Sequence, residues 1–281
     1  MTFGLDAVTV SYGEVRALDD VTVAAPPGSV VALVGGDGAG KSTALRALVR
    51  EVVPDSGRVR SPAKPQIGFL PASAGSWAAL TVRQNLDFAA RTYGLEGDRL
   101  EKRRTELLET AGLTGAADRL ASQLSGGMRR KLGFCMAIAH QPELVVLDEP
   151  STGVDPVSRI DLWRLISEAA AAGTAVVMST TYLDEAERAA HLVVLDGGSV
   201  LVQGSYDEVR AGFSGTITRA ADATRPAWSW RRGRERHEYW PAADPPHDLA
   251  VVDPDLEDIV IALSLAGSVE PGTPDGQGGA S

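Results

Sequence analysis

One short stretch of the chain has the residue types and spacing of a phosphate-binding loop. The segment GGDGAGKST matches the pattern G-x-x-x-x-G-K-[ST]. Its glycines let consecutive backbone N–H groups point at phosphate oxygens, and the helix start adds partial positive charge. Lys41 would place a cation near the β- and γ-phosphates, and Ser42 would offer a hydroxyl to Mg²⁺. The residues expected to contact a nucleoside triphosphate are Gly35, Gly36, Asp37, Gly38, Ala39, Gly40, Lys41, Ser42 and Thr43.

Two acidic residues follow an apolar strand in the segment LVVLDEP, residues 144–150. Asp148 is placed to hold Mg²⁺, directly or through water. Glu149 would orient or deprotonate the water that attacks the terminal phosphate. Two acids at a strand end are often no more than exposed side chains, but the phosphate loop upstream favours a metal site with a general base.

A third segment, LSGGMRRK at residues 124–131, predicts another anion-binding helix start. Ser125 is expected to cap the helix, which would begin near Met128 after two glycines. The chain would then hold two phosphate-binding elements but a single phosphate loop. Dimerisation is one way to use both elements, with the second element of each chain closing the site of the other chain.

The elements that position these residues alternate between strands and helices, which predicts an α/β fold with a mostly parallel sheet. Residues 3–33 contain short β-rich pieces separated by turns, which indicates antiparallel strands. The segment HLVVLDGGSVLVQG, residues 191–204, indicates a hairpin that turns on two glycines. Buried strands are expected at 30–35, 144–148 and 175–180, and helices at 42–52, 98–113, 128–140 and 157–172.

Composition limits the classes of function. The 281 residues are 44% hydrophobic and 23% charged with a net charge of -10, so the overall charge does not indicate a nucleic-acid partner. The basic segment RRGRER, 231–236, lacks an aromatic platform, and we expect a solvated loop. The single cysteine, Cys135, excludes an intrachain disulfide and is expected to be an inert core residue. We find no signal-peptide pattern and no apolar run of about 18 residues, so a membrane role would require a partner.

Together these motifs resemble the ATP-binding subunit of an ABC transporter, across roughly residues 3–210. The phosphate loop resembles Walker A, LVVLDEP resembles Walker B, LSGGM resembles the family signature, and STGVD at 151–155 resembles the D-loop. The resemblance implies a P-loop NTPase core with a mostly parallel sheet. It also implies an N-terminal antiparallel β subdomain and an inserted α-helical subdomain.

The resemblance further implies that the nucleotide is ATP and that two chains enclose it. ATP would lie between Walker A of one chain and the signature of the other, and Asp155 would lie at the dimer contact. Tyr12 corresponds by position to the aromatic residue that stacks on adenine, although a strand tyrosine buried in the core is an alternative. The signature residues expected to contact the partner's ATP are Ser125, Gly126, Gly127 and Met128.

The expected domain organisation follows from the resemblance and from the weaker pattern beyond it. Residues 1–210 would form the ATP-binding domain, with a helical subdomain at about 73–140 that contacts a membrane subunit. Residues 211–266 would form a small C-terminal extension that ends in an apolar helix. The Gly/Pro-rich residues 267–281 would form a disordered tail.

Several segments are most similar to subunits that serve ABC-2-type exporters, a group that includes drug-resistance pumps. The similarity implies a separate ABC-2-type membrane subunit. It also implies a cytoplasmic position on the inner face of the cell membrane, held there by that subunit. The transported substrate is chosen by the membrane subunit and cannot be read from this chain. The segments are LTVRQNLDFAARTYGL (80–95), STGVDPVSR (151–159), YLDEAE (182–187) and LEDIVIAL (256–263).

Two positions depart from the family pattern where water would be activated. Thr181 stands where the family has a histidine that would bond the γ-phosphate, and threonine has a shorter reach and cannot be a cation. Ala72 stands where the family has a glutamine that contacts Mg²⁺ and water, and alanine offers no ligand atom. Asp37 replaces the usual asparagine and would weaken triphosphate binding unless a cation screens it. Because losing one transition-state donor costs about 10²–10³ in rate, we expect slow hydrolysis.

We therefore expect a catalytically weakened chain that binds Mg·ATP and completes the site of a second ATP-binding chain, in a heterodimer rather than a homodimer. The first half of some tandem subunits of ABC-2 exporters shows a similar loss of histidine. One alternative is an ordinary homodimeric transporter ATPase that tolerates both substitutions. Another is a soluble ABC ATPase outside transport, although the sequence shows no second cassette, coiled-coil insertion or long basic linker.

Overall fold

The computed structural model describes residues 1–73, 75–222, 224–241, 245–246 and 248–268. The chain divides into two compact units, Met1–Ser205 and a second unit that begins at Tyr206. The boundary expected from the sequence, near residue 210, falls inside the first helix of the second unit.

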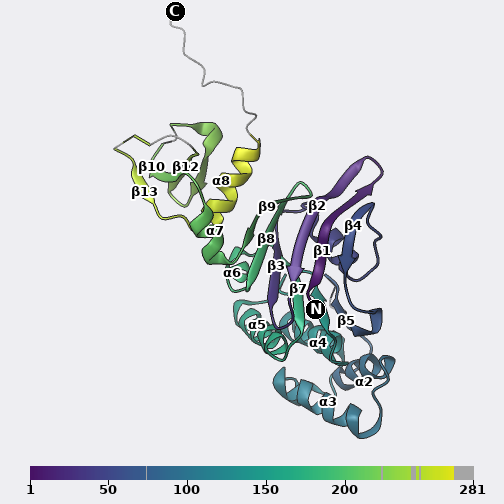
Figure 1. Ribbon diagram of the computed structural model, residues 1–281. Coiled ribbons are helices and arrows are strands. Elements are labelled where there is room, and N and C mark those ends of the chain that lie inside the picture. The colour runs from purple at the N-terminus through teal and green to yellow at the C-terminus, as the bar shows by residue number, and fades with distance from the viewer. Residues whose placement is uncertain (74, 223, 242–244, 247, 269–281) are drawn as a thin grey trace, which may run out of the picture. The chain divides into compact units, whose positions relative to one another are not determined.

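The first unit contains two sheets (Figure 1). One has six strands in the order β5-β6-β7-β3-β8-β9, with parallel pairing except for the antiparallel edge strand β9. The other is antiparallel, in the order β2-β1-β4. The predicted α/β fold, with a mostly parallel sheet and an N-terminal antiparallel sheet, is confirmed. The strands are β1 (Phe3–Tyr12), β2 (Val15–Ala25), β3 (Val30–Val34), β4 (Ser56–Arg60), β5 (Ile67–Leu70), β6 (Leu144–Leu147), β7 (Ala175–Thr180), β8 (His191–Asp196) and β9 (Ser199–Gly204).

Continuous apolar sequences form the central strands of the six-stranded sheet. Every residue of β3, β6 and β7 is buried, as expected for parallel strands that are covered on both faces. Side chains of β1 and β2 alternate more strongly between buried and exposed positions. The main core lies between the two sheets, where Val10 and Val21 cluster with Leu33 of β3 and with Leu45 and Leu48 of α1.

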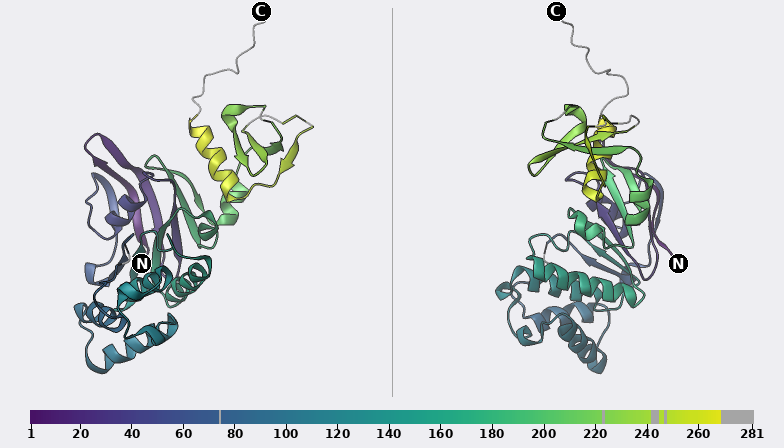
Figure 2. Two further views of the ribbon diagram at one scale, coloured as in Figure 1. Left: turned by 180° about the vertical axis from the view of Figure 1, so that it is seen from behind. Right: turned by 90° about the vertical axis from the view of Figure 1, so that its left-hand side faces the viewer.

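The helices of the first unit include an insertion between β5 and β6. In Figures 1 and 2, α2 and α3 lie together at the end of the unit opposite β1, β2 and β4. Thr81 caps α2 through a reciprocal pair of hydrogen bonds with Gln84, which defines the start of this helix. The inserted α-helical part of the predicted fold is thus present. The helices are α1 (Lys41–Leu48), α2 (Val82–Thr92), α3 (Gly97–Thr110), α4 (Gly126–Ile138), α5 (Pro156–Ala171) and α6 (Leu183–Ala186), with 3₁₀ turns at Lys64–Gln66, Thr114–Ala116 and Ala121–Gln123.

Two helix boundaries differ from the sequence-based expectation. The helix after the phosphate loop ends at Leu48 rather than at residue 52, because Arg50 has a φ of 59°, a left-handed conformation that no regular helix continues through. The signature helix α4 begins at Gly126 rather than near Met128. The predicted cap is correct: the Ser125 hydroxyl oxygen accepts a hydrogen bond from the Met128 N–H at 3.2 Å.

The second unit is a four-stranded antiparallel sheet, ordered β11-β12-β10-β13, with α8 packed against it (Figures 1 and 2). Ile217, Tyr239 and Ala262 form its small buried core. Among the described helices of the chain, none is both long enough and apolar enough to span a membrane. The elements are α7 (Tyr206–Gly212), β10 (Thr216–Ala220), a 3₁₀ turn (Pro226–Trp228), β11 (Ser229–Arg232), β12 (Glu235–Trp240), β13 (Ala250–Val252) and α8 (Leu256–Ser268).

Two sequence-based expectations for the second unit are wrong. The basic segment 231–236 is a β-hairpin rather than a solvated loop, because Gly233 turns the chain with a φ of 64° and Arg232 donates to the buried Asp258 carboxylate at 2.8 Å. The predicted tail was expected to begin at residue 267, but α8 continues to Ser268. The rest of that predicted tail, 269–281, lies outside the described residues.

Candidate nucleotide-binding site

The candidate site lies at the carboxyl ends of β3, β6 and β7. Strand β7 pairs with both neighbours, since Thr180 is in register with Val34 of β3 and Met178 with Leu147 of β6. The segments that follow these strands therefore meet at one edge of the sheet. This topology brings together the phosphate loop, the acidic pair after β6 and the expected switch position after β7, which is the usual place for a ligand site in a parallel sheet.

The phosphate loop reaches its conformation through glycines that cannot carry a side chain. Gly40 has a φ of 103°, and a Cβ there would lie 2.5 Å from the Ala17 carbonyl oxygen. A Cβ on Gly35 would lie 2.4 Å from the carbonyl oxygen of Leu195. Gly40 also precedes α1 without a side-chain cap, so the first N–H groups of the helix face the loop and are free to bind an anion.

Lys41 is the cation of this loop. Its ammonium group donates to the carbonyl oxygens of Gly35 and Gly36 at 2.8 and 2.9 Å, and the residue is 6% exposed. These bonds fold the lysine side chain back over the loop. Phosphate oxygens bound in the loop would be within reach of the same ammonium group, so the residues present fit a triphosphate.

A cleft of about 300 Å³ joins the expected nucleotide contacts. Tyr12 is 51% exposed at the end of β1, so the alternative of a tyrosine buried in the core is wrong. Its ring lines the same cleft as Glu149 and the phosphate loop, which is compatible with stacking on a base. The lining residues are Tyr12, Ala17, Asp37, Gly38, Ala39, Gly40, Lys41, Ser42, Thr43 and Glu149.

A hydroxyl that the sequence analysis did not single out organises the acidic pair. Ser179, fully buried near the end of β7, donates to Asp148 Oδ1 at 2.8 Å and accepts the Glu149 N–H at 2.9 Å. The Ser42 hydroxyl lies 3.4 Å from the same Asp148 oxygen. Hydroxyl and carboxylate oxygens are ligands that suit Mg²⁺, so the donor set fits this ion. Ser179 could have been suspected as a polar residue inside an apolar strand.

Glu149 is held in an uncommon backbone conformation. Its φ is 46°, in the left-handed region, and its carboxylate accepts a hydrogen bond from the Thr152 hydroxyl at 3.1 Å. Non-glycine residues in this conformation cost free energy and are concentrated at functional sites. The side chain lines the cleft of the phosphate loop, which is where a general base for water would have to lie.

The signature and the D-loop share one surface. A Cβ on Gly127 would lie 2.4 Å from Ser158, so the start of α4 packs directly on the start of α5. Asp155 caps α5 by accepting the Ser158 N–H at 3.0 Å, and its hydrogen bonds from Ser158 lower the pKa of this carboxyl. In the part of the chain that the structure describes, the lining of the phosphate-loop cleft does not include Ser125, Gly126 or Met128.

The two positions expected to depart from the family pattern lie in exposed segments that follow β5 and β7. Ala72 follows β5, whose Leu70 carbonyl oxygen accepts the Asp148 N–H at 2.8 Å. Thr181 follows β7 directly and is also exposed. The structure therefore places each residue after the strand where the family resemblance expects its switch residue.

Glu185 is a second residue whose role the sequence analysis missed. Its buried carboxylate accepts hydrogen bonds from the hydroxyls of Ser151 and Thr180, each at 2.8 Å. It thereby connects the segment after the acidic pair with the end of β7. Arg159 lies 3.9 Å from the other carboxylate oxygen. This network fixes the backbone on both sides of Thr181 without contacting the nucleotide cleft.

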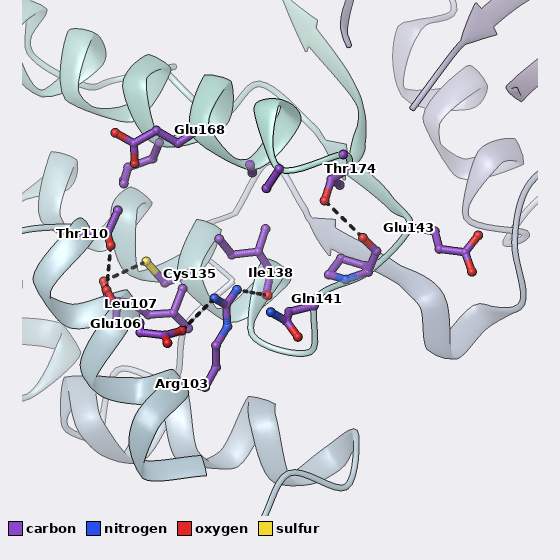
Figure 3. Close-up of a pocket in the computed structure, with 15 residues that line it drawn as sticks. Arg103, Glu106, Leu107, Thr110, Cys135, Ile138, Gln141, Glu143, Glu168 and Thr174 are labelled. Atoms are coloured by element: carbon purple, nitrogen blue, oxygen red, sulfur yellow. Dashed lines mark hydrogen bonds and ion pairs between the residues drawn. The ribbon is translucent and has the colours of Figure 1, made fainter. Parts of the chain in front are cut away.

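A separate cavity of about 390 Å³ is lined by residues of helices α3, α4 and α5 and of the loops next to them (Figure 3). Arg103 of α3 donates to the carbonyl oxygens of Ile138 and Ala139 at 2.8 and 3.1 Å. Cys135 lies in the wall of this cavity, and burial raises the pKa of its thiol to about 12. The expected core position of this cysteine is confirmed by its burial.

A smaller groove of about 230 Å³ lies between the loop after β5 and helices α2 and α4. Trp77 and Phe88 line it and are 47% and 51% exposed, with their rings in an edge-to-face contact at 4.5 Å. Two large apolar side chains exposed side by side are unusual on a protein surface that contacts only water.

Comparison with known proteins agrees with this geometry. The family model for ABC transporters matches residues 18–152. The daunorubicin resistance ATP-binding protein DrrA2 of Streptomyces coeruleorubidus is 39% identical over 216 residues, covering 73% of this chain and 67% of that protein. The probable multidrug ABC transporter ATP-binding protein YbhF of Escherichia coli K12 is 36% identical, covering 70% of this chain and 36% of its own length. The solved structure of an ATP-binding subunit of an ABC transporter is 28% identical with a TM-score of 0.68. The match covers 76% of this chain and 93% of that chain.

The chain therefore belongs to the family of ABC transporter ATP-binding proteins, and it is an ABC-type ATPase. The family recognised from the sequence motifs is confirmed. The individual roles expected for the site residues stay predictions.

Proposed function

We propose that the chain is the ATP-binding subunit of an exporter and drives a separate ABC-2-type membrane subunit. The observation that carries this proposal is the single cleft shared by Tyr12, the phosphate loop and Glu149, next to Asp148. The names of relatives that confer daunorubicin resistance or multidrug transport support export rather than import.

In this proposal each residue of the cleft has one task toward Mg·ATP. Tyr12 stacks on the base, the loop N–H groups and Lys41 hold the β- and γ-phosphates, and Ser42 and Asp148 hold Mg²⁺. A bound Mg²⁺ supplies charge neutralisation for the phosphate oxygens. Glu149 takes the proton of the attacking water, and its strained backbone keeps the carboxylate directed at the cleft.

The groove lined by Trp77 and Phe88 is our candidate for the membrane-subunit contact. It lies on the helical insertion, and its floor includes Phe69 and Leu70 of β5, the strand that leads to Ala72. An apolar segment of a membrane subunit would cover the two exposed aromatic rings. Such a contact would hold the chain at the cytoplasmic face of the membrane.

The chain is further proposed to hydrolyse ATP slowly. Alanine at position 72 and threonine at position 181 supply no cation and no long polar reach toward the γ-phosphate. The phosphate loop and the acidic pair are retained, so binding persists where hydrolysis is weakened. Because the signature residues lie outside the chain's own cleft, they are available to a second ATP-binding chain, and we propose a heterodimer in which that partner carries the efficient site.

The decisive experiment compares ATP hydrolysis by the purified chain with that of Thr181→His plus Ala72→Gln, with nucleotide binding measured alongside. The expected result is tight Mg·ATP binding, low native activity and a gain of about 10²-fold in the restored variant. The single variants Thr181→His and Ala72→Gln are the matched controls. Brisk, cooperative hydrolysis by the native chain would overturn the weakened-partner proposal and favour an ordinary homodimeric transporter ATPase.

A second measurement separates a transport subunit from an ABC ATPase outside transport. A photocrosslinking residue at position 88 should capture a polytopic membrane protein in native membranes. The same residue at position 53, where Val53 is 87% exposed away from the groove, is the matched control. Equal capture from both positions, or no capture from position 88, would argue against a membrane partner in this groove.

A further inference from the structure

The loop at residues 71–73 is held by a side chain from the signature helix. Arg130 of α4 donates from Nη1 to the carbonyl oxygens of Pro71 and Ser73 at 3.3 and 3.0 Å. Its Nη2 donates to the carbonyl oxygen of Ala72 at 2.5 Å. Three successive carbonyl groups therefore converge on one guanidinium group, and the middle one belongs to the residue that replaces the expected glutamine.

We propose that Arg130 is a positioning residue that holds loop 71–73 beside the metal-binding carboxylates, in place of the missing glutamine side chain, and thereby links the signature helix to the metal site of its own chain. The inference rests on the proposed function, since it assigns a task to Arg130 within the same Mg·ATP site. Arg130 contacts no reacting group itself and acts through the backbone of the loop.

The backbone connects this loop directly to the acidic pair. The carbonyl oxygen of Leu70, one residue before the loop, accepts the N–H of Asp148 at 2.8 Å. A displacement of residues 71–73 would therefore shift the backbone that positions Asp148. Leu70 is the residue directly before the loop, and it bonds Asp148 directly. The loop and the metal-binding carboxylate are therefore coupled through one hydrogen bond.

The charge of Arg130 also reaches the acidic pair. Burial lowers the pKa of Arg130, while the negative charges of Glu149 and Asp148 act in the opposite direction. The guanidinium group is thus partly removed from water and interacts with both carboxylates. Charge-assisted hydrogen bonds in such surroundings are stronger than those between neutral groups.

The shape of the side chain matters as well as its charge. A planar guanidinium group can address several carbonyl oxygens at fixed angles, whereas a lysine ammonium group is a compact point charge. The preceding residue provides a matched comparison, because Arg129 donates to the Leu124 carbonyl oxygen at 3.3 Å and has no described contact with the loop. Removing either arginine deletes one charge from the same turn of α4.

The linkage has a direction. Ser125 is the N-cap of α4, and Arg130 lies five residues later, near the N-terminal end of the same helix. When the signature engages the nucleotide of a partner chain, a shift of α4 would be carried by Arg130 into loop 71–73. The metal site of this chain would then respond to the occupancy of the partner's site.

Hydrogen exchange of the peptide that covers residues 68–73 tests the clamp without any nucleotide. Exchange should be about 10-fold faster in Arg130→Met, partly faster in Arg130→Lys, and as in the native chain in Arg129→Met. Unchanged exchange in Arg130→Met would overturn the proposal. If Arg130→Met does not fold, the exchange rate of Arg130→Lys tests the clamp alone, because lysine keeps the positive charge but lacks the planar guanidinium group.

The Mg²⁺ dependence of nucleotide binding tests the functional part. The Mg²⁺ concentration for half-maximal binding should rise about 10-fold in Arg130→Met, and adding Ala72→Gln should return it to within about 3-fold of the native value. A purely structural arginine would show no rescue by glutamine. If the native chain fails to bind Mg·ATP, the proposed function fails. A failed clamp leaves native binding intact and appears as unchanged exchange and an unchanged Mg²⁺ requirement in Arg130→Met.

Discussion

The phosphate cleft and the two switch positions lie at the same edge of one sheet, but they are built from different parts of the chain. In the cleft, backbone N–H groups of a glycine-rich loop do most of the expected binding. At positions 72 and 181, the family uses long side chains, and this chain has a methyl group and a short hydroxyl. The backbone-encoded half of the site, the phosphate loop at residues 35–43, thus depends on backbone conformation. The other half, positions 72 and 181, depends on single side chains.

On the proposed function, this difference would explain how nucleotide binding persists while hydrolysis is weakened. Side chains on Gly35 or Gly40 would collide with carbonyl oxygens of β8 and β2, so those positions are fixed by the fold itself. The side chains of Ala72 and Thr181 are exposed, so we expect that replacing them leaves the sheet unchanged. A chain of this kind can lose efficient hydrolysis without losing nucleotide binding or the ability to dimerise.

The largest effect on stability is expected at the backbone-encoded half. Gly40→Ala should lower the free energy of unfolding by about 2 kcal/mol, because the residue has a φ of 103° and the added Cβ meets Ala17 O at 2.5 Å. Gly36→Ala is the matched control in the same loop: it has open space and no left-handed φ, and should change stability by less than about 0.5 kcal/mol. Equal urea midpoints for the two variants would show that the backbone conformation at Gly40 does not constrain the phosphate loop as proposed.

The sequence predicted the backbone-encoded half well and the side-chain network poorly. The phosphate loop and the acidic pair were recognisable because each follows an apolar strand, and parallel pairing then brings strand ends together. The contacts of Ser179 and Arg130 depend on which strands are neighbours and on how α4 lies against the loop after β5, and neither follows from residue spacing. The hairpin at 231–236 was missed for the same reason, since the partner of Arg232, Asp258, is 26 residues away.

A smaller effect is expected where a single hydroxyl organises the acidic pair. Ser179→Ala should raise the Mg²⁺ concentration needed for half-maximal nucleotide binding about 10-fold, because Asp148 loses its 2.8 Å donor and Glu149 loses the acceptor for its N–H. Thr180→Ala is the neighbouring control, since its hydroxyl bonds Glu185 and not the acidic pair. Titration with a fluorescent ATP analogue measures both, and an equal shift in the two variants would show that any hydroxyl loss in β7 has this effect.

The smallest effect concerns an aromatic stack inside the helical insertion. His140 stacks on Tyr93 at 3.6 Å, and burial lowers its pKa to about 4, with the positive charge of Arg103 acting in the same direction. The unfolded chain, with an ordinary histidine pKa of about 6.5, binds more protons between these values, so this contribution to stability is lost as pH falls from about 6.5 toward 4.

Comparing thermal unfolding at pH 7 and pH 5 should therefore show a smaller drop in Tm for His140→Gln than for the native chain. The difference should be about 2 °C or less, because the ring is only partly buried and one group among many titrates. An identical drop would mean that the stack opens before the histidine is protonated. A difference well above about 2 °C would instead make the insertion, whose groove is the proposed membrane contact, a part of the molecule that is especially sensitive to acid.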